Sequence, residues 1–167
     1  MTVSLHPQID PSLLPVLELV ADPEIPVLSV LDLGVIRQAV VKDGEVYIKL
    51  TPTYTGCPAM DVISDDLKAA FASQGTKAHV SLVLAPAWST DWISQAGRDK
   101  MKAYGIAPPL EESADKAAIL GEQRVVPCPQ CKSTNTHMVS QFGSTACKAL
   151  FKCNDCQEPF DYFKCLK

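Results

Sequence analysis

The fold of this chain is decided by residues 46–71, VYIKLTPTYTGCPAMDVISDDLKAAF, where a strand pattern changes into a helix pattern. Val46, Ile48 and Leu50 alternate with Tyr and Lys, which is the period of a half-buried strand. Apolar residues then recur every three or four positions as far as Phe71, which is the period of an amphipathic helix. The stretch therefore predicts a strand, a short loop and a helix that packs on the apolar face of the strand.

The flanking sequence predicts a mixed α and β domain around this stretch. We expect a helix over 13–20, a strand over 35–41, an Asp-Gly turn into the strand at 46–50, a third strand over 80–84 and a last helix over 91–104. The order α-β-β-α-β-α with a three-stranded sheet belongs to the α+β class. An uncovered edge of such a sheet would also permit a homodimer.

The placement of the cysteines divides the chain in two. The chain has 167 residues and seven cysteines, and six of the cysteines follow residue 127. Two adjacent prolines, Pro108 and Pro109, stop a helix and stiffen an extended segment. The sequence therefore predicts a first domain over 1–104, a linker over 105–126 and a β-rich, metal-stabilised ribbon over 127–167.

Composition excludes several classes of function. The net charge of -4 argues against a nucleic-acid partner, because phosphate binding needs a clustered basic surface. No apolar stretch approaches the roughly 20 residues that span a bilayer, so a membrane protein is not expected. The first Lys or Arg is Arg37, so a signal peptide with a basic start is not expected either. These features predict a cytoplasmic protein.

Two C-x-x-C pairs predict a metal site in the ribbon. The pairs are Cys128 with Cys131 and Cys153 with Cys156, and four thiolates complete a tetrahedron around one metal ion. A module of about 40 residues has too small a hydrophobic core to be stable without a bound metal ion. Structural zinc is the default ion, and iron also accepts four thiolates. Two separate redox pairs are the alternative, without the βαβ pattern that usually accompanies them.

Two further cysteines in the ribbon remain open to two interpretations. If Cys147 lies on a straight strand, it is about 20 Å from Cys153 and cannot join the same metal ion. Cys165 follows an aromatic strand pattern. Both cysteines are either small buried apolar residues or a second thiol site for a labile metal or cluster.

Cys57 is the candidate reactive residue of the first domain. Because Pro58 suits the first position of a helix, Cys57 is predicted to be the N-cap, with its sulfur near free backbone N–H groups. Such a position stabilises a thiolate and favours a nucleophile or a soft-metal ligand. A buried structural cysteine is the alternative. No histidine is near in sequence, so a Cys/His catalytic pair is unsupported.

An acidic, proline-containing stretch precedes the first strand and contains Glu24 and Asp32. The two acids are either caps for backbone N–H groups in a rigid turn or side chains that line a site with Cys57.

These stretches resemble a known family. DPEIPVLSVLDLGVI and TPTYTGCPA are similar to the pattern of SufT-like iron–sulfur cluster assembly domains, over about residues 10–104. The matching positions are Glu24, Asp32, Gly34, Thr51, Thr53 and Cys57. The chain as a whole, with LAPAWSTDWIS and FGSTACKALFKCNDCQEPFDYFKC, resembles the PaaD family, the D subunits of bacterial phenylacetyl-CoA epoxidase systems.

The resemblance implies an accessory or maturation subunit that is not itself catalytic. It implies a role in aerobic phenylacetate degradation. The subunit would assist iron–sulfur cluster assembly on the reductase of the epoxidase system, which carries flavin and a [2Fe–2S] cluster. Cys57 would be a transient ligand of iron or of a cluster, in a loop with Glu24, Asp32, Thr51 and Thr53. The alternatives are a structural subunit, an electron-transfer module with iron in the ribbon, or a thiol enzyme that uses Cys57.

Overall fold

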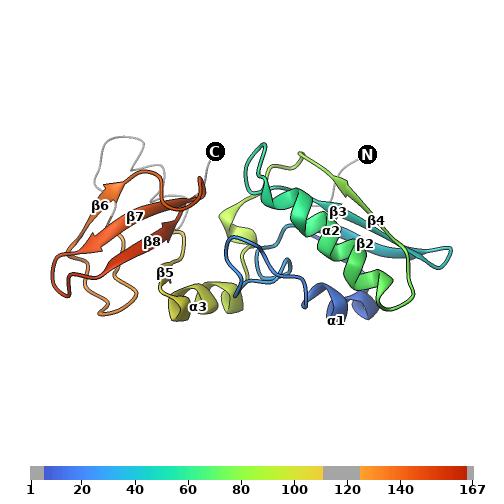
Figure 1. Ribbon diagram of the computed structural model, residues 1–167, viewed down its shortest axis with the longest axis horizontal. Coiled ribbons are helices and arrows are strands. Elements are labelled where there is room, and N and C mark those ends of the chain that lie inside the picture. Colours follow the sequence, from blue (N-terminus) through green and yellow to red (C-terminus); the bar gives the residue numbers. More distant parts are fainter. Residues whose placement is uncertain (1–5, 111–124, 165–167) are drawn as a thin grey trace. The chain divides into compact units, whose positions relative to one another are not determined.

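The computed structural model describes residues 6–110 and 125–164, which form two compact units, Met1–Gly97 and Arg98–Lys167 (Figure 1). Each unit has its own four-stranded sheet, and the described helices longer than one turn are α2 and α3. The predicted α+β class is confirmed. The domain limits at 104 and 126 stay a prediction, because residues 111–124 of the expected linker lie outside the described residues.

The sheet of the first unit has the strand order β1-β2-β3-β4. Its strands are β1 (Gln8–Ile9), β2 (Ile36–Lys42), β3 (Glu45–Leu50) and β4 (Ala78–Leu82). The β2–β3 pair is antiparallel, whereas β1 is parallel to β2 and β4 is parallel to β3. The prediction of a three-stranded sheet was wrong, because the sheet also contains β1. This strand is only two residues long and is therefore too short to show an alternating pattern in the sequence.

The hairpin between β2 and β3 forms as its Asp-Gly sequence predicts. Asp43 and Gly44 both have positive φ values, 51° and 80°. This left-handed conformation suits a two-residue turn whose twist matches the strands. The turn fixes the register, so that Val46, Ile48 and Leu50 are all buried on one face of β3.

Helix α2 (Ala59–Ala72) connects β3 to the parallel strand β4 and packs against it. Its buried face consists of Ala59, Met60, Ile63, Leu67 and Phe71, at the expected helical spacing. This face and the apolar residues of β3 form the centre of the core. The loop over 51–58 is thus anchored at both ends, by the buried faces of β3 and α2.

The two other helices that the sequence predicts within residues 1–104 are shorter than expected. The helix expected over 13–20 is a 3-10 turn (Pro11–Leu13) followed by α1 (Leu14–Leu17). Asp10 caps the 3-10 turn, because its Oδ1 accepts the Ser12 N–H at 3.0 Å. The chain then turns so that Ala21 pairs with Ser29, which ends the helix early.

The helix expected over 91–104 is divided into a 3-10 turn (Thr90–Trp92) and α3 (Gln95–Tyr104). The break follows from the loop that it meets. Ile93 is extended, and the Ser94 N–H donates to the Asp32 carbonyl at 2.8 Å instead of to a helical partner.

The sheet of the second unit has the strand order β5-β8-β7-β6. Its strands are β5 (Ile106–Ala107), β6 (Thr136–Ser140), β7 (Lys148–Cys153) and β8 (Pro159–Phe163). The aromatic core includes Phe151, whose ring packs edge-on against Tyr162 with the centroids 5.6 Å apart. This small core also contains Cys128 and Cys153, so the cysteine site and the core are one structure.

Candidate functional site: a buried thiol and a four-cysteine cluster

Cys57 lies at the end of the loop between β3 and α2. Helix α2 begins at Ala59 with Pro58 as its N-cap residue, so the helix starts one residue later than predicted. The Cys57 carbonyl nevertheless accepts the Met60 N–H at 3.3 Å. The side chain is only 9% exposed. The thiol is therefore close to the helix start but largely removed from solvent.

The environment of Cys57 raises the pKa of its thiol, so the predicted thiolate is wrong. Burial is the largest cause, and the carboxylates of Glu24 and Asp22 add to it. The Ala59 N–H and the Tyr54 side chain hydrogen-bond the sulfur and act in the opposite direction. The helix-start N–H that the sequence predicted is thus present, but desolvation outweighs it.

Asp22 and Glu24, in the acidic stretch before β2, have different roles. Asp22 is the cap: its Oδ1 accepts the N–H groups of Glu24 and Ile25, both at 2.8 Å. Glu24 is only half-buried, and its charge acts on the Cys57 thiol. Sequence reasoning placed Asp22 in this acidic turn but did not identify it as the capping residue, although an Asp followed by Pro is a usual signal for a turn.

Asp32 is buried and organises a second turn. Its Oδ2 accepts the Ser29 N–H at 3.0 Å, and its Oδ1 accepts the Ser94 hydroxyl at 3.1 Å. The structure therefore shows Asp32 in a capping role, and its place in a site with Cys57 stays a prediction.

The two threonines of the motif differ in their surroundings. Thr51 is buried, and its backbone N–H donates to the Val35 carbonyl at 2.8 Å. Among the described residues, no group hydrogen-bonds the buried Thr51 hydroxyl oxygen. Thr53 is half-buried in the loop that leads to Cys57.

The four C-x-x-C cysteines come together as predicted. The Sγ atoms of Cys128, Cys131, Cys153 and Cys156 all lie within 4.8 Å of one another. The Sγ atoms of Cys128 and Cys156 are 3.7 Å apart, and those of Cys131 and Cys153 are 3.6 Å apart. Sulfurs bound to one zinc ion at about 2.3 Å would lie about 3.8 Å apart. The cluster thus has the size of a tetrahedral metal site.

Each C-x-x-C pair forms the same kind of turn. The residue after each pair, Lys132 or Gln157, has a positive φ of 66° or 65°. Cys128 N–H donates to the Ser133 carbonyl and Cys153 N–H to the Glu158 carbonyl, both at 2.9 Å. The Cys156 N–H is the largest cause that lowers the pKa of the Cys153 thiol to about 7, whereas burial and the neighbouring thiols raise the pKa of the Cys156 thiol to about 12.

Polar side chains connect the two turns, and sequence reasoning missed them. Asp155 from the second turn accepts hydrogen bonds from the Ser133 hydroxyl and from Asn135 Nδ2, the latter at 2.8 Å. The Asn154 N–H donates to the Asn135 carbonyl at 2.9 Å. The partners are about 20 residues apart, so no local pattern in the sequence could identify them.

The structure keeps Cys147 apart from this cluster. Cys147 is buried, and its Sγ lies 3.1 Å from the Thr145 hydroxyl. Among the described residues, the four-cysteine cluster is the one group of three or more metal-ligating side chains. Cys165 lies outside the described residues, so a second thiol site stays a prediction.

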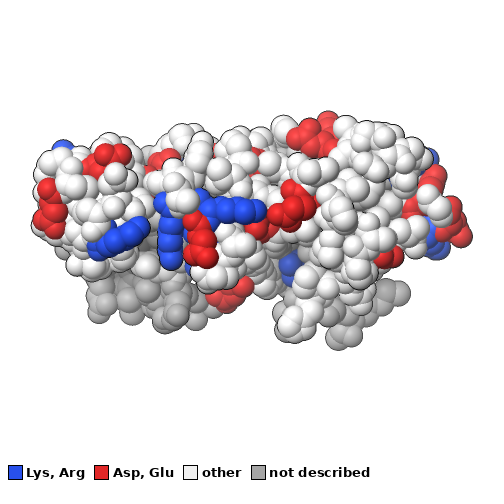
Figure 2. Space-filling model, turned by 90° about the horizontal axis from the view of Figure 1, so that it is seen from below, with Lys and Arg blue, Asp and Glu red and all other residues white. Residues whose placement is uncertain are grey.

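Basic and acidic side chains are mixed on one face of the molecule, and the absence of a nucleic-acid partner stays a prediction. On the face shown in Figure 2, the described Lys and Arg side chains lie among Asp and Glu and form no continuous basic surface. Within the described ranges, no helix has the length and apolar character needed to cross a bilayer.

Two family models match the chain in separate parts. The model of an iron–sulfur cluster assembly protein matches residues 12–82, which contain Cys57. The model of the PaaD zinc beta ribbon domain matches residues 112–164, which contain the four clustered cysteines.

Individual relatives agree with both matches. An Escherichia coli (strain K12) protein, provisionally named as the D subunit of 1,2-phenylacetyl-CoA epoxidase, is 47% identical over 88% of this chain and 87% of its own. A Porphyromonas gingivalis Fe-S protein maturation auxiliary factor is 37% identical over 53% of this chain and 86% of its own. The crystal structure of a DUF59 domain from Bacillus anthracis aligns with a TM-score of 0.50 and 26% identity, over 54% of this chain and 88% of that domain.

The E. coli relative matches nearly the full length of both chains, across both matched regions. The chain therefore belongs to the PaaD family of phenylacetyl-CoA epoxidase D subunits, which here joins an iron–sulfur cluster assembly domain to a zinc beta ribbon.

Proposed function

We propose that the protein is a non-catalytic accessory factor that assists iron–sulfur cluster assembly on the reductase of a phenylacetyl-CoA epoxidase system. The observation that carries the proposal is the 47% identity to a protein named as the D subunit of that epoxidase. The match of residues 12–82 to an iron–sulfur assembly family supports the assembly role.

Cys57 would be the residue that holds the cargo, iron or a cluster, during transfer. Its raised pKa keeps the thiol protonated at neutral pH, and a metal that binds there must displace the proton. Protonation protects the free protein from oxidation, because the thiolate is the reactive form. The loop between β3 and α2, anchored at both ends, would position the sulfur, and the Glu24 carboxylate would supply negative charge for a cation.

The Thr51 hydroxyl fits the same role. It is buried next to the start of this loop and has no hydrogen-bond partner among the described residues. A buried hydroxyl without a partner is destabilising by about 1–3 kcal/mol, which makes a purely structural role for the Thr51 hydroxyl unfavourable.

The ribbon would hold a structural metal ion, and zinc is the ion that its size and four thiolates favour. Cys128, Cys131, Cys153 and Cys156 would be the ligands. Bound zinc would supply a stable crosslink between the two turns. Anaerobic metal and sulfide analysis distinguishes zinc from iron, and a visible absorption band would point to iron and to an electron-transfer role instead.

A complementation experiment tests the role of Cys57. A strain that lacks the gene is complemented with the wild-type protein, with Cys57→Ser, or with Thr55→Ala as a control in the same loop. We expect the Cys57→Ser strain to grow poorly on phenylacetate and its purified reductase to contain less than about a third of the normal cluster, as for loss of a transfer ligand. The Thr55→Ala strain should grow normally, because Thr55 is exposed.

Two outcomes would contradict the proposal in different ways. Normal growth and normal cluster content would make Cys57 a structural residue. Poor growth with a fully loaded reductase would place the function elsewhere, in a structural subunit or in thiol chemistry.

A further inference from the structure

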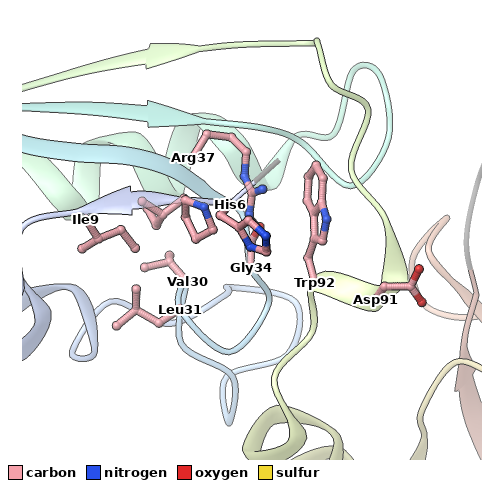
Figure 3. A pocket seen from close by; sticks show the side chains of 10 residues that line it. His6, Ile9, Val30, Leu31, Gly34, Arg37, Asp91 and Trp92 are labelled. Atoms are coloured by element: carbon pink, nitrogen blue, oxygen red, sulfur yellow. Dashed lines mark hydrogen bonds between the residues drawn. The ribbon is translucent and has the colours of Figure 1, made fainter. Parts of the chain in front are cut away.

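A cavity of about 480 Å³ in the first unit is bordered by polar groups that serve the fold (Figure 3). The Arg37 side chain donates from Nη2 to the Gly34 carbonyl at 2.8 Å, and its Cζ lies 3.7 Å from the centroid of the Trp92 ring. The Asp91 carboxylate accepts the Ser89 hydroxyl at 3.2 Å. These groups hold the loops of the first unit together, whereas the second unit exposes side chains that add little to its core.

Apolar side chains are exposed along β6, which is the edge strand of the second sheet (Figure 1). The Thr136 hydroxyl at the start of this strand donates to the Val126 carbonyl at 2.7 Å, which places the segment before Val126 beside β6. At about 400 Å² in total, the exposed apolar area is similar to the largest patch on a typical monomeric protein, and such patches are often functional. Four side chains, each 54–58% exposed, form this surface, which we call the β6 strip: Val125, Met138, Val139 and Phe142.

A β-bulge shapes the middle of the β6 strip. The register of β6 against β7 shifts between Met138 and Ser140, so Val139 is the extra residue. A bulge bends the edge of a sheet and changes the direction of its side chains. It also interrupts the ladder to which another strand could be added. The strip therefore offers its side chains to a partner rather than a long hydrogen-bonding edge.

Contacts within the ribbon orient the Phe142 ring, although it is exposed. The Ser140 hydroxyl accepts the Phe142 N–H at 3.3 Å and donates to the Phe142 carbonyl at 2.8 Å. The Lys164 Nζ lies 4.0 Å from the ring centroid, and the Lys164 N–H donates to the Cys147 carbonyl at 2.9 Å. An aromatic side chain that is oriented before a partner arrives loses less entropy on binding, which suits it as an anchor of an interface.

The charges around the β6 strip indicate which kind of surface fits it. Residues 133–147 contain no Asp, Glu, Lys or Arg. Cations border the strip at both ends, since Lys152 is the cross-strand neighbour of His137 and Lys164 lies over the Phe142 ring. The strip thus has an uncharged centre and a basic border.

A second copy of this chain fits the strip poorly. In a twofold contact between two β6 strands the two ends are exchanged, so Lys152 of one copy would approach Lys164 of the other. Like charges that face each other disfavour such a contact. The acid of the neighbouring strand β8 does not change this balance, because the Asp161 carboxylate lies 3.9 Å from the Lys148 Nζ and neutralises that cation. A partner with acidic side chains fits the border better.

We propose that the β6 strip is a docking surface for another protein, whose contact surface is apolar at its centre and carries Asp or Glu at its border. Phe142 and Met138 would enter the apolar centre, because aromatic and Met side chains are enriched in the buried parts of interfaces. The acidic border would lie near Lys152 and Lys164, where opposite charges speed up association and select the partner. An apolar area of about 400 Å² is half of the roughly 800 Å² that each partner buries in a stable complex, so the contact is a transient one.

Binding to the other purified proteins of the same epoxidase system tests the proposal. Each is labelled with a fluorophore and titrated with the full-length protein, and the fluorescence anisotropy is followed. We expect at least one of them to bind with a Kd on the order of 10 µM. The affinity should fall as the salt concentration rises, because salt screens the charges of the border. Since the docking surface is separate from the proposed transfer site, Cys57→Ser should bind with an unchanged Kd.

Substitutions locate the docking surface. Phe142→Ala should raise the Kd at least about tenfold, whereas Tyr104→Ala should not, because Tyr104 is a similarly exposed aromatic residue of the second unit outside the strip. Val139→Asp places a charge inside the strip and should also abolish binding, which covers the case in which Phe142→Ala disturbs its turn. Lys152→Glu should raise the Kd about fivefold and flatten the salt dependence, with Lys102→Glu on α3 as its control. Circular dichroism verifies that each variant is folded.

Several results would overturn the proposal. One is the failure of every epoxidase protein to bind at about 100 µM, a concentration well above the expected Kd. Another is an unchanged Kd in both Phe142→Ala and Val139→Asp. Equal effects of Lys152→Glu and Lys102→Glu would contradict the acidic border. Sedimentation of the protein alone provides the last check, because a wild-type dimer that Val139→Asp dissociates would show that a second copy covers the strip.

Discussion

Some neighbours of Cys57 raise the pKa of its thiol and others lower it. Burial and the charges of Asp22 and Glu24 favour the protonated sulfur, whereas the Ala59 N–H favours the thiolate. Burial has the largest effect on the pKa of the thiol, and each charged neighbour adds a smaller one. Glu24 is the best neighbour to change, because Asp22 also holds the turn together.

Glu24→Gln should make Cys57 more reactive. Removal of the negative charge lowers the pKa of the thiol, so a larger fraction is thiolate at any pH below that pKa. At about pH 8 we expect alkylation of Cys57 by iodoacetamide to be about two- to threefold faster than in the wild type. Mass spectrometry of the Cys57 peptide over a pH series from neutral to alkaline measures the rate, and the two curves should converge at high pH.

Asp43→Asn is the matched control for this change. It also removes one acidic charge, but from the exposed turn between β2 and β3, and Asn tolerates the positive φ there. Its alkylation rate should equal that of the wild type. An unchanged or slower rate in Glu24→Gln would show that Glu24 does not act on the thiol.

Hydrogen bonds connect the two C-x-x-C turns. Asp155, in the turn between Cys153 and Cys156, accepts them from Ser133 and Asn135, which follow the turn between Cys128 and Cys131. Asp155→Ala should lower the affinity of the ribbon for its metal ion by about tenfold, because groups that support ligands have effects of this size. Competition with a chelating dye gives the affinity. Glu158→Ala removes an equal charge from the exposed end of the same turn and should change it little.

Equal affinities in the Asp155 and Glu158 variants would contradict this explanation. The network would then be a surface feature with no influence on the cluster.

Elements with a local pattern were predictable from the sequence, whereas contacts between distant residues were not. The alternation in β3, the Asp-Gly turn and the spacing of the four cysteines each depend on neighbouring residues, and each appears in the structure. Strand β1 and the break before α3 depend on partners far away in the sequence. No periodicity in the chain encodes them.

The burial of individual side chains, and its effect on their charge, was harder to predict than their position along the chain. Cys57 was expected near a helix start, and it lies there, yet its pKa shifts upward because burial cannot be read from a loop sequence. Arg37 occupies a strand position where a cation would be expected to face water. It is buried because Trp92, more than fifty residues away, stacks on it.

The whole molecule should unfold in parts, because each unit has its own sheet and core. Cys128→Ser removes one proposed ligand from inside the core of the second unit. We expect loss of the metal and collapse of NMR signal dispersion for 125–164, since metal binding and folding are coupled in such modules. The signals of 6–97 should keep their positions.

Cys57→Ser serves as the control at this scale. It also exchanges a buried sulfur for oxygen, but in the first unit, and should retain both the metal and the dispersed signals of the ribbon. A Cys128→Ser protein that keeps one equivalent of metal and a folded ribbon would refute the proposed ligand set.

The four clustered cysteines do not share solvent equally. Cys128 and Cys153 are buried, whereas Cys131 and Cys156 are exposed. With a metal ion bound, an incoming competitor would meet only the exposed pair, and those two sulfurs would be displaced first. Exchange of the ion would then follow an associative route from one side, with a rate that grows with the concentration of the competitor. Such a centre can be thermodynamically tight and still be exchanged readily when another thiol-rich protein approaches that side.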